Sequence, residues 1–148
     1  MRHELTEPAE RDIRDILRNT MQMFGPKQTR AYARIIELSI QLVSEDPDRP
    51  GSIERAELAA GVRLLHLEIA ARRRGGAAHC LYYMKGRLSD ETIGVIVVRV
   101  LHERMEPRHR VIRALNNIAR AKGGSPEMPD GDEPSRGSSG AGDFSGAS

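Results

Sequence analysis

The sequence of 148 residues predicts an α+β fold: a helical hairpin, then the strands of an antiparallel sheet, then one more helix. Three observations predict it. Apolar residues recur at helical spacing over residues 7–45 and are interrupted once, at Gly25-Pro26. The apolar spacing changes towards a period of two after Gly51, and the helical period returns over residues 107–121.

The first segment combines a short strand with a helix. Residues 2–6 are expected to form the strand, and Thr6 is a suitable N-cap for a helix whose first turn contains Glu7 and Pro8. Helical spacing then predicts one apolar face, made of Ala9, Ile13, Ile16, Leu17, Met21 and Phe24.

Gly25-Pro26 ends this helix and starts the next, which ends before Asp46. A connection this short predicts an antiparallel hairpin. The buried stripe of the second helix is expected to contain Tyr32, Ile35, Leu38, Ser39, Leu42 and Val43.

Three strands are predicted in the second half of the domain, over residues 61–69, 79–85 and 93–102. An exposed turn at 72–76 and a polar loop at 86–92 connect them. The nearly unbroken β-branched run of residues 93–102 is typical of a central strand covered on both faces.

The last helix is expected over residues 107–121, with Val111, Ile112, Leu115, Ile118 and Ala119 at helical spacing. Residues 123–148 contain seven Gly, six Ser, three Pro and five acidic residues, a composition that cannot bury enough apolar surface to order a chain. The sequence therefore predicts one domain at 1–122 and a disordered tail at 123–148.

Charge is distributed unevenly along the chain. The whole chain carries a formal net charge of +2, whereas residues 61–122 contain 13 basic and five acidic side chains, and the tail is net negative. The basic half predicts an acidic partner, either nucleic acid or an acidic protein segment.

Several classes of protein are not indicated. The single cysteine, Cys80, cannot form an internal disulfide, the N-terminus lacks the apolar run of a signal peptide, and no stretch is long enough to span a membrane. We therefore expect a cytoplasmic protein without membrane contact. The sequence contains no strong metal, phosphate-loop or catalytic motif, so no metal or cofactor is expected.

Basic and aromatic side chains on the predicted strands are the candidate functional residues. Arg63, His79, Tyr83 and Arg99 could align across an antiparallel sheet, where they would present a positive face suited to an RNA phosphate. Arg99 lies within a hydrophobic run, so the alternative is that it pairs with a helix carboxylate or emerges at an edge. Arg72-Arg73-Arg74 is interpreted as a solvated loop.

Four stretches resemble the RelE/ParE superfamily of toxins of type II toxin–antitoxin systems, and its ParE branch in particular. They are Leu5–Ile13, Phe24–Tyr32, Gly61-Val62-Arg63, and Tyr82-Tyr83 leading to Val98–Glu106. The last stretch, with its V-L-H-E-R-M-E sequence, is the most specific, and the resemblance covers residues 4–110.

This resemblance implies a helical hairpin on a small, strongly twisted antiparallel sheet, and a toxin held inactive by a cognate antitoxin. The antitoxin would bind through an acidic, helical C-terminal segment. It would form a hetero-oligomer with the toxin, and operator DNA would be reached only through the antitoxin. By the same resemblance, the antitoxin-binding residues are Tyr32, Leu65, Leu67, Tyr82 and Arg99.

Two activities occur in this superfamily. ParE-like members inhibit DNA gyrase by binding, and this activity is favoured here, with an activity surface at Arg63, Arg99, His102 and Arg104. RelE-like members are ribosome-dependent mRNA endonucleases that need no metal. If the chain were such an enzyme, the catalytic residues would be Arg63, His79, Tyr83, Arg99 and His102. A third possibility is a non-toxic member that binds its antitoxin only as a co-repressor.

The sequence departs from the family pattern in two places. The segment at 69–78 is longer than the usual link between strands, and the chain continues past Arg110 into a further helix and the acidic tail. The tail is interpreted as a solubilising appendage; the alternative is that it folds back on the basic sheet and weakens target binding.

Overall fold

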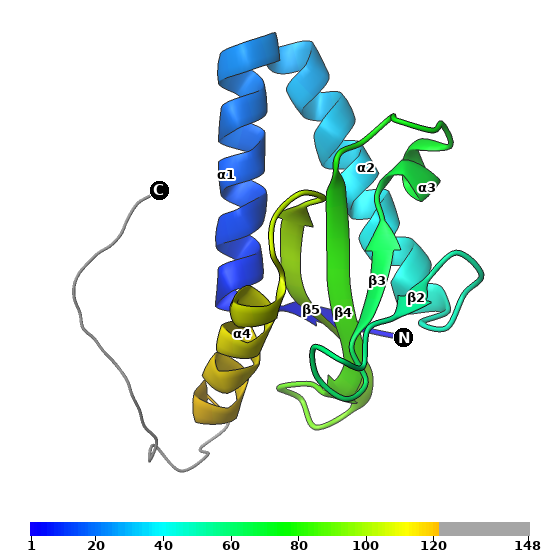
Figure 1. The fold of residues 1–148 in the computed structure, drawn as a ribbon, viewed down its shortest axis with the longest axis vertical. Coiled ribbons are helices and arrows are strands. Elements are labelled where there is room, and N and C mark those ends of the chain that lie inside the picture. Colours follow the sequence, from blue (N-terminus) through cyan, green and yellow to red (C-terminus); the bar gives the residue numbers. More distant parts are fainter. Residues whose placement is uncertain (122–148) are drawn as a thin grey trace, which may run out of the picture. The chain divides into compact units, whose positions relative to one another are not determined.

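The computed structural model describes residues 1–121, so the predicted tail at 123–148 and the domain boundary at 122 lie outside the described residues. Residues Met1–Asn117 form one compact unit, and Ile118–Ser148 belong to a second. The first unit has the predicted α+β architecture, with two N-terminal helices on one face of a five-stranded sheet (Figure 1).

The first helix, α1 (Glu7–Phe24), is capped as the sequence predicts. The Thr6 hydroxyl accepts a hydrogen bond from the Ala9 N–H at 3.0 Å, and it donates one to the Val98 carbonyl at 2.8 Å. Such a cap stabilises a helix by about 1 kcal/mol. The second bond places the start of α1 against the strand that contains Val98.

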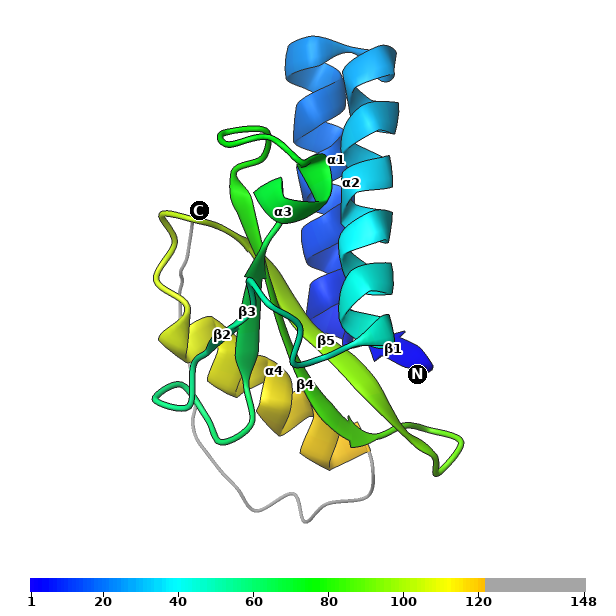
Figure 2. The same cartoon turned by 90° about the vertical axis from the view of Figure 1, so that its right-hand side faces the viewer.

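Gly25 makes the tight turn between α1 and α2 (Pro26–Glu45). Its φ of 85° lies in the left-handed region that favours glycine, and Pro26 opens the next helix without needing a hydrogen-bond acceptor for an N–H. Figure 2 shows the two helices side by side on one side of the strands, with the tip of the hairpin extending past the end of the sheet.

The sheet order is β1-β5-β4-β3-β2, and all pairs are antiparallel except β1 (His3–Leu5) with β5 (Ile93–His102), which is parallel. The bounds of β5 are those that the sequence predicts for the strand at 93–102. Its residues Val95–Val98 are all buried, which confirms that both of its faces are covered. A β-bulge interrupts the pairing with β4 (His79–Arg87) between Tyr82 and Tyr83.

The prediction of a strand over residues 61–69 is wrong at both ends. The strand β3 covers only Arg63–His66, and a single helical turn, α3 (Glu68–Ala71), follows it. Arg72, in the left-handed conformation at φ 59°, ends that turn. The alternation of apolar residues beyond His66 therefore reflected burial of Leu67 and Ala70, not strand geometry.

Two further differences concern the strands. A short strand, β2 (Ile53–Glu54), pairs with β3 and was not predicted. The strand β4 continues through Gly86 and Arg87, which the sequence assigned to a loop. Gly94, opposite Gly86, allows close packing, because a Cβ there would lie 2.5 Å from the Arg2 carbonyl oxygen.

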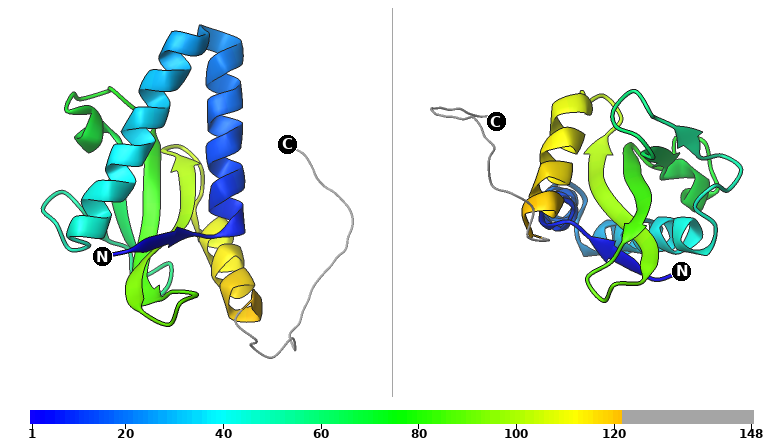
Figure 3. Two further views of the ribbon diagram at one scale, coloured as in Figure 1. Left: turned by 180° about the vertical axis from the view of Figure 1, so that it is seen from behind. Right: turned by 90° about the horizontal axis from the view of Figure 1, so that it is seen from below.

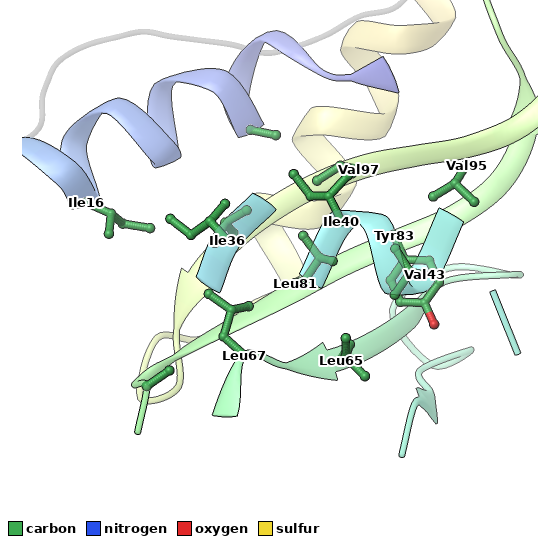
Figure 4. Packing of buried hydrophobic residues seen from close by; sticks show 13 residues of the cluster. Ile16, Ile36, Ile40, Val43, Leu65, Leu67, Leu81, Tyr83, Val95 and Val97 are labelled. Atoms are coloured by element: carbon green, nitrogen blue, oxygen red, sulfur yellow. The ribbon is translucent and has the colours of Figure 1, made fainter. Parts of the chain in front are cut away.

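The core lies between the hairpin and the sheet (Figure 4), and Figure 3 shows both helices covering that face. Tyr83, Leu81 and Leu65 from the sheet meet Ile36 and Val43 from α2. Some of the predicted helix faces are wrong: Met21, Phe24 and Leu38 are exposed, because the hairpin tip extends beyond the sheet and the α2 stripe is rotated towards Ile36 and Ile40.

The last helix, α4 (Arg108–Ala121), begins one residue later than predicted. Its buried side chains Val111 and Ala114 belong to the first unit. Figure 2 shows the start of α4 on the side of the sheet away from the hairpin. Both faces of β5 are therefore covered by helices.

Candidate functional site

A groove of about 630 Å³ lies between α1 and the C-terminal end of β5. Asp12, Thr20 and Phe24 line it from the helix, and Arg99 and His102 line it from the strand. The groove begins where β1 ends, because that short strand covers the edge of β5 only as far as Val97. It is the candidate functional site.

Arg99 is held by a carboxylate of α1. Its Nε and one Nη atom donate to the two oxygens of Asp12, both at 2.7 Å. The Val100 N–H donates to the same carboxylate at 3.0 Å, so Asp12 also satisfies the open edge of β5. This geometry confirms the interpretation that Arg99 pairs with a helix carboxylate.

Tyr32, His79 and His102 form a cluster next to this pair. The Tyr32 hydroxyl accepts from the Ala78 N–H at 3.2 Å, so its own O–H is available to donate to His79 Nδ1, 2.6 Å away. His79 and His102 face each other across β4 and β5, with ring centroids 5.3 Å apart and a near-perpendicular arrangement. Burial, followed by the charge of His102, lowers the pKa of His79 to about 4, so this ring is neutral at pH 7.

A hydrogen-bonded pair of a histidine and a glutamate, His66 and Glu103, lies beside this cluster. His66 Nδ1 accepts from the Glu68 N–H at 3.1 Å, which leaves Nε2 to donate to Glu103, 2.7 Å away. This hydrogen bond lowers the pKa of the Glu103 carboxyl. Neither residue was among the predicted site residues; their only signal was polarity at the C-terminal ends of β3 and β5, which lie on either side of β4.

The rim of the groove is apolar. Met23, Phe24 and Met105 line it with exposed fractions of 72%, 65% and 46%. Exposed apolar side chains gathered at one place mark interaction sites. The rim could have been suspected from the sequence, because Met23 and Phe24 are adjacent and cannot share one helix face.

The predicted site residues therefore separate into two sets. His79, Arg99 and His102 line the groove, and Arg104 is exposed just beyond it. Arg63 is held by Ser52, with Asp48 and Glu54 nearby, and is absent from the residues that line the groove. Tyr83 does share a face with His79, but it is fully buried in the core and donates to the Pro47 carbonyl at 2.6 Å.

The residues assigned to antitoxin binding are also divided. Leu65 and Leu67 have no exposed surface, and Tyr82 is 4% exposed. Because the chain itself covers these three side chains, the structure places them in the interior and not on a surface. Tyr32 and Arg99 are partly exposed.

The described residues contain no group of three or more side chains arranged to hold a metal ion. Cys80 is buried, and that burial raises the pKa of its thiol to about 11, so it is a packing residue and not a nucleophile. Within the described part of the chain, no helix is long and apolar enough to cross a membrane.

Comparison with known proteins gives two matches. Residues 4–107 match a family described as the ParE toxin of the type II toxin–antitoxin system parDE. The chain is also 28% identical over 106 residues to "Toxin ParE1" of Caulobacter vibrioides, an alignment that covers 72% of this chain and 93% of that protein.

Proposed function

Because this chain belongs to the ParE family of toxins of type II toxin–antitoxin systems, we propose that it inhibits DNA gyrase by binding and is neutralised by a cognate antitoxin. Membership of such a system implies an antitoxin partner. The identity of the target, and the surfaces that bind target and antitoxin, are the proposed parts.

The proposed antitoxin-binding site is supported by apolar and cationic side chains that lie together at the groove. Met23, Phe24 and Met105 offer exposed apolar surface, and Arg110 lines the same groove. An amphipathic segment with acidic side chains would bury the first set and face the second. The proposed antitoxin contacts are therefore the rim residues together with Tyr32 and Arg99, in place of Leu65, Leu67 and Tyr82.

The ion pair between Arg99 and Asp12 favours inhibition by binding over catalysis of RNA cleavage. A ribonuclease without metal needs cations free to stabilise the negative charge of the phosphorane. Here both oxygens of Asp12 already pair with the Arg99 guanidinium. We place the target surface at His102 and Arg104, at the end of β5, whereas Arg63 is engaged with Ser52 elsewhere in the sheet.

A gyrase assay tests this proposal directly. Purified chain should inhibit supercoiling by gyrase, and equimolar antitoxin should restore it. His102→Ala and Arg104→Ala should each weaken inhibition by about tenfold, an effect of about 1.4 kcal/mol on binding. Arg73→Ala, in the exposed loop after α3, is the matched control and should inhibit like the unaltered chain.

Circular dichroism should show that each variant is folded. If His102→Ala and Arg104→Ala inhibit as strongly as the control, the target surface is assigned incorrectly. If the unaltered chain arrests growth while gyrase remains active, the target is wrong.

One observation favours endoribonuclease activity as a second candidate. His79 and His102 lie side by side at the groove, and imidazoles are the groups that most often transfer protons in catalysis. Induced expression would then cut mRNA on stalled ribosomes, and His79→Gln would abolish the cuts. A chain that neither arrests growth nor cuts mRNA, yet binds its antitoxin, would be a co-repressor.

A further inference from the structure

The helix α4 follows the segment that matches the ParE family, which ends at residue 107. Between Arg108 and Ala121 this helix carries four arginines and a histidine and contains no acidic residue. Val111 and Ala114 are fully buried and anchor the first part of the helix. The helix α4 is therefore strongly basic and is anchored by buried side chains. It lies after the segment that matches the family.

A row of polar side chains on α4 points to solvent, next to Ile112, which is 39% exposed. His109, Arg113 and Asn116 follow each other at spacings of four and three residues, so they lie on one side of the helix, away from Val111 and Ala114. All three are exposed. We refer to these three residues as the α4 polar face.

Among the described residues, the side chains of Arg108, Arg110 and Arg113 form no ion pair with a carboxylate. Arg113 makes no ion pair or hydrogen bond through its side chain with any described residue. Arg108 and Arg110 donate to the backbone carbonyls of Glu57 and Glu106, at 3.0 and 2.8 Å, and not to carboxylates. Both arginines are oriented by these bonds. Arg108 also lies near the Glu57 carboxyl, whose pKa is lowered mainly by its hydrogen bond with Arg55 and further by the charge of Arg108.

We propose that the α4 polar face binds duplex DNA directly. Its arginine, Arg113, would contact a phosphate, and Asn116 carries the amide that pairs with an adenine edge in the major groove. An α-helix fits that groove, about 12 Å wide, whereas the major groove of duplex RNA is too narrow. The inference departs from the expectation that operator DNA is reached only through the antitoxin.

The composition of the face favours DNA over an acidic peptide. A peptide docked on a helix buries apolar anchors as well as forming ion pairs. The three residues of the α4 polar face offer none: Val111 and Ala114 are buried, and the apolar surface beside the face is that of Ile112, which is 39% exposed. Charged and amide groups without an apolar stripe are suited to phosphates and base edges.

The inference does not depend on gyrase being the target, and a direct binding measurement tests it. The full chain is titrated into a fluorescently labelled 24-base-pair DNA duplex at several salt concentrations, and the anisotropy is recorded. We expect Arg113→Gln to weaken binding by about tenfold and to lower the slope of log K against log salt by about 1. Asn116→Ala should reduce the preference among duplex sequences.

Arg34→Gln is the matched control, because Arg34 is an exposed arginine of α2 and its loss changes the net charge equally. If Arg34→Gln and Arg113→Gln weaken binding equally, binding is diffuse and the proposal fails. Duplex RNA that competes as well as DNA would exclude major-groove docking. If DNA does not bind and Arg113→Gln instead weakens the antitoxin complex, the helix is a protein-docking surface and the proposal is overturned.

Discussion

Arg99 shows how a strand with two buried faces can contain a charge. At the point where β1 ends, the backbone of β5 would be left with an unpaired N–H at Val100, and a carboxylate from α1 satisfies both that group and the guanidinium. The Asp12 and Arg99 side chains are only 12% and 16% exposed. One aspartate therefore joins the hairpin to the sheet.

Removing that aspartate should be costly. Asp12→Ala is expected to lower the free energy of unfolding by about 3 kcal/mol, because it leaves a largely buried arginine and a strand N–H without their acceptor. Urea unfolding followed by circular dichroism measures this. Asp15→Ala, on the same helix, removes only an exposed pair with Arg18 and should cost less than about 0.5 kcal/mol. Equal losses in the two variants would contradict this account.

His79 should make the stability of the protein depend on pH. Its folded-state pKa of about 4 lies below the 6.5 of an unfolded histidine, so the unfolded chain binds more protons between these values. Stability is therefore lost as the pH falls from 6.5 to 4, by on the order of 1–2 kcal/mol after allowing for solvent screening of a partly exposed ring.

The measurement is urea unfolding at several pH values. His79→Gln should flatten the change between pH 6.5 and 4. His109→Gln, on the exposed face of α4, should keep the slope of the unaltered chain. An unchanged slope in His79→Gln would show that the pKa of this ring is the same in the folded and unfolded chains.

At the scale of elements, the hairpin tip and the sheet differ in length. Because α1 and α2 extend past the strands, the last turn of α1 has no sheet beneath it, and its apolar residues remain exposed (Figure 1). Apolar surface left in contact with water does not stabilise a monomer. The excess length of the hairpin therefore supplies the apolar rim of the groove.

Polar substitutions at the hairpin tip should weaken antitoxin binding without lowering the stability of the fold. Met23→Ser with Phe24→Ser is expected to weaken antitoxin affinity by at least 100-fold, because two exposed anchors are lost, and to change the free energy of unfolding by less than about 1 kcal/mol. Isothermal titration calorimetry and urea unfolding measure the two quantities. Ile53→Ser, an equally exposed apolar position on β2, is the control and should leave affinity unchanged. Unaltered affinity in the double variant would place the antitoxin elsewhere.

At the scale of the whole molecule, the sequence predicted most of the fold, because local signals were strong where they agreed with tertiary packing. Thr6 at the cap, Gly25-Pro26 at the turn and the β-branched run at 93–102 each act within a few residues, and all three predictions are confirmed. The end of β3 was mispredicted because Leu67 and Ala70 are buried in a helical turn, and periodicity over so few residues does not distinguish the two geometries.

The site was harder to predict than the fold, since its geometry depends on contacts between distant residues. Nothing local to Asp12 indicates a partner 87 positions away, and the alignment of His79 with His102 depends on register. The bulge in β4 and β5 shifts that register by one residue. Tyr83 and His79 lie on the same face of β4, as their spacing of four residues predicts. That face is the one covered by the helices, so Tyr83 is buried in the core.

The parallel pairing of β1 with β5 has a consequence for the order of events during synthesis. Residues 3–5 find their strand partner only at 95–97, and the Thr6 amide and hydroxyl bond to carbonyls of Val97 and Val98. Such long-range contacts form late in folding. As the chain leaves the ribosome, residues 3–5 emerge before α1 and α2, but this N-terminal strand has no edge to join until β5 has emerged. A nascent chain released early thus lacks both the closed sheet and the groove.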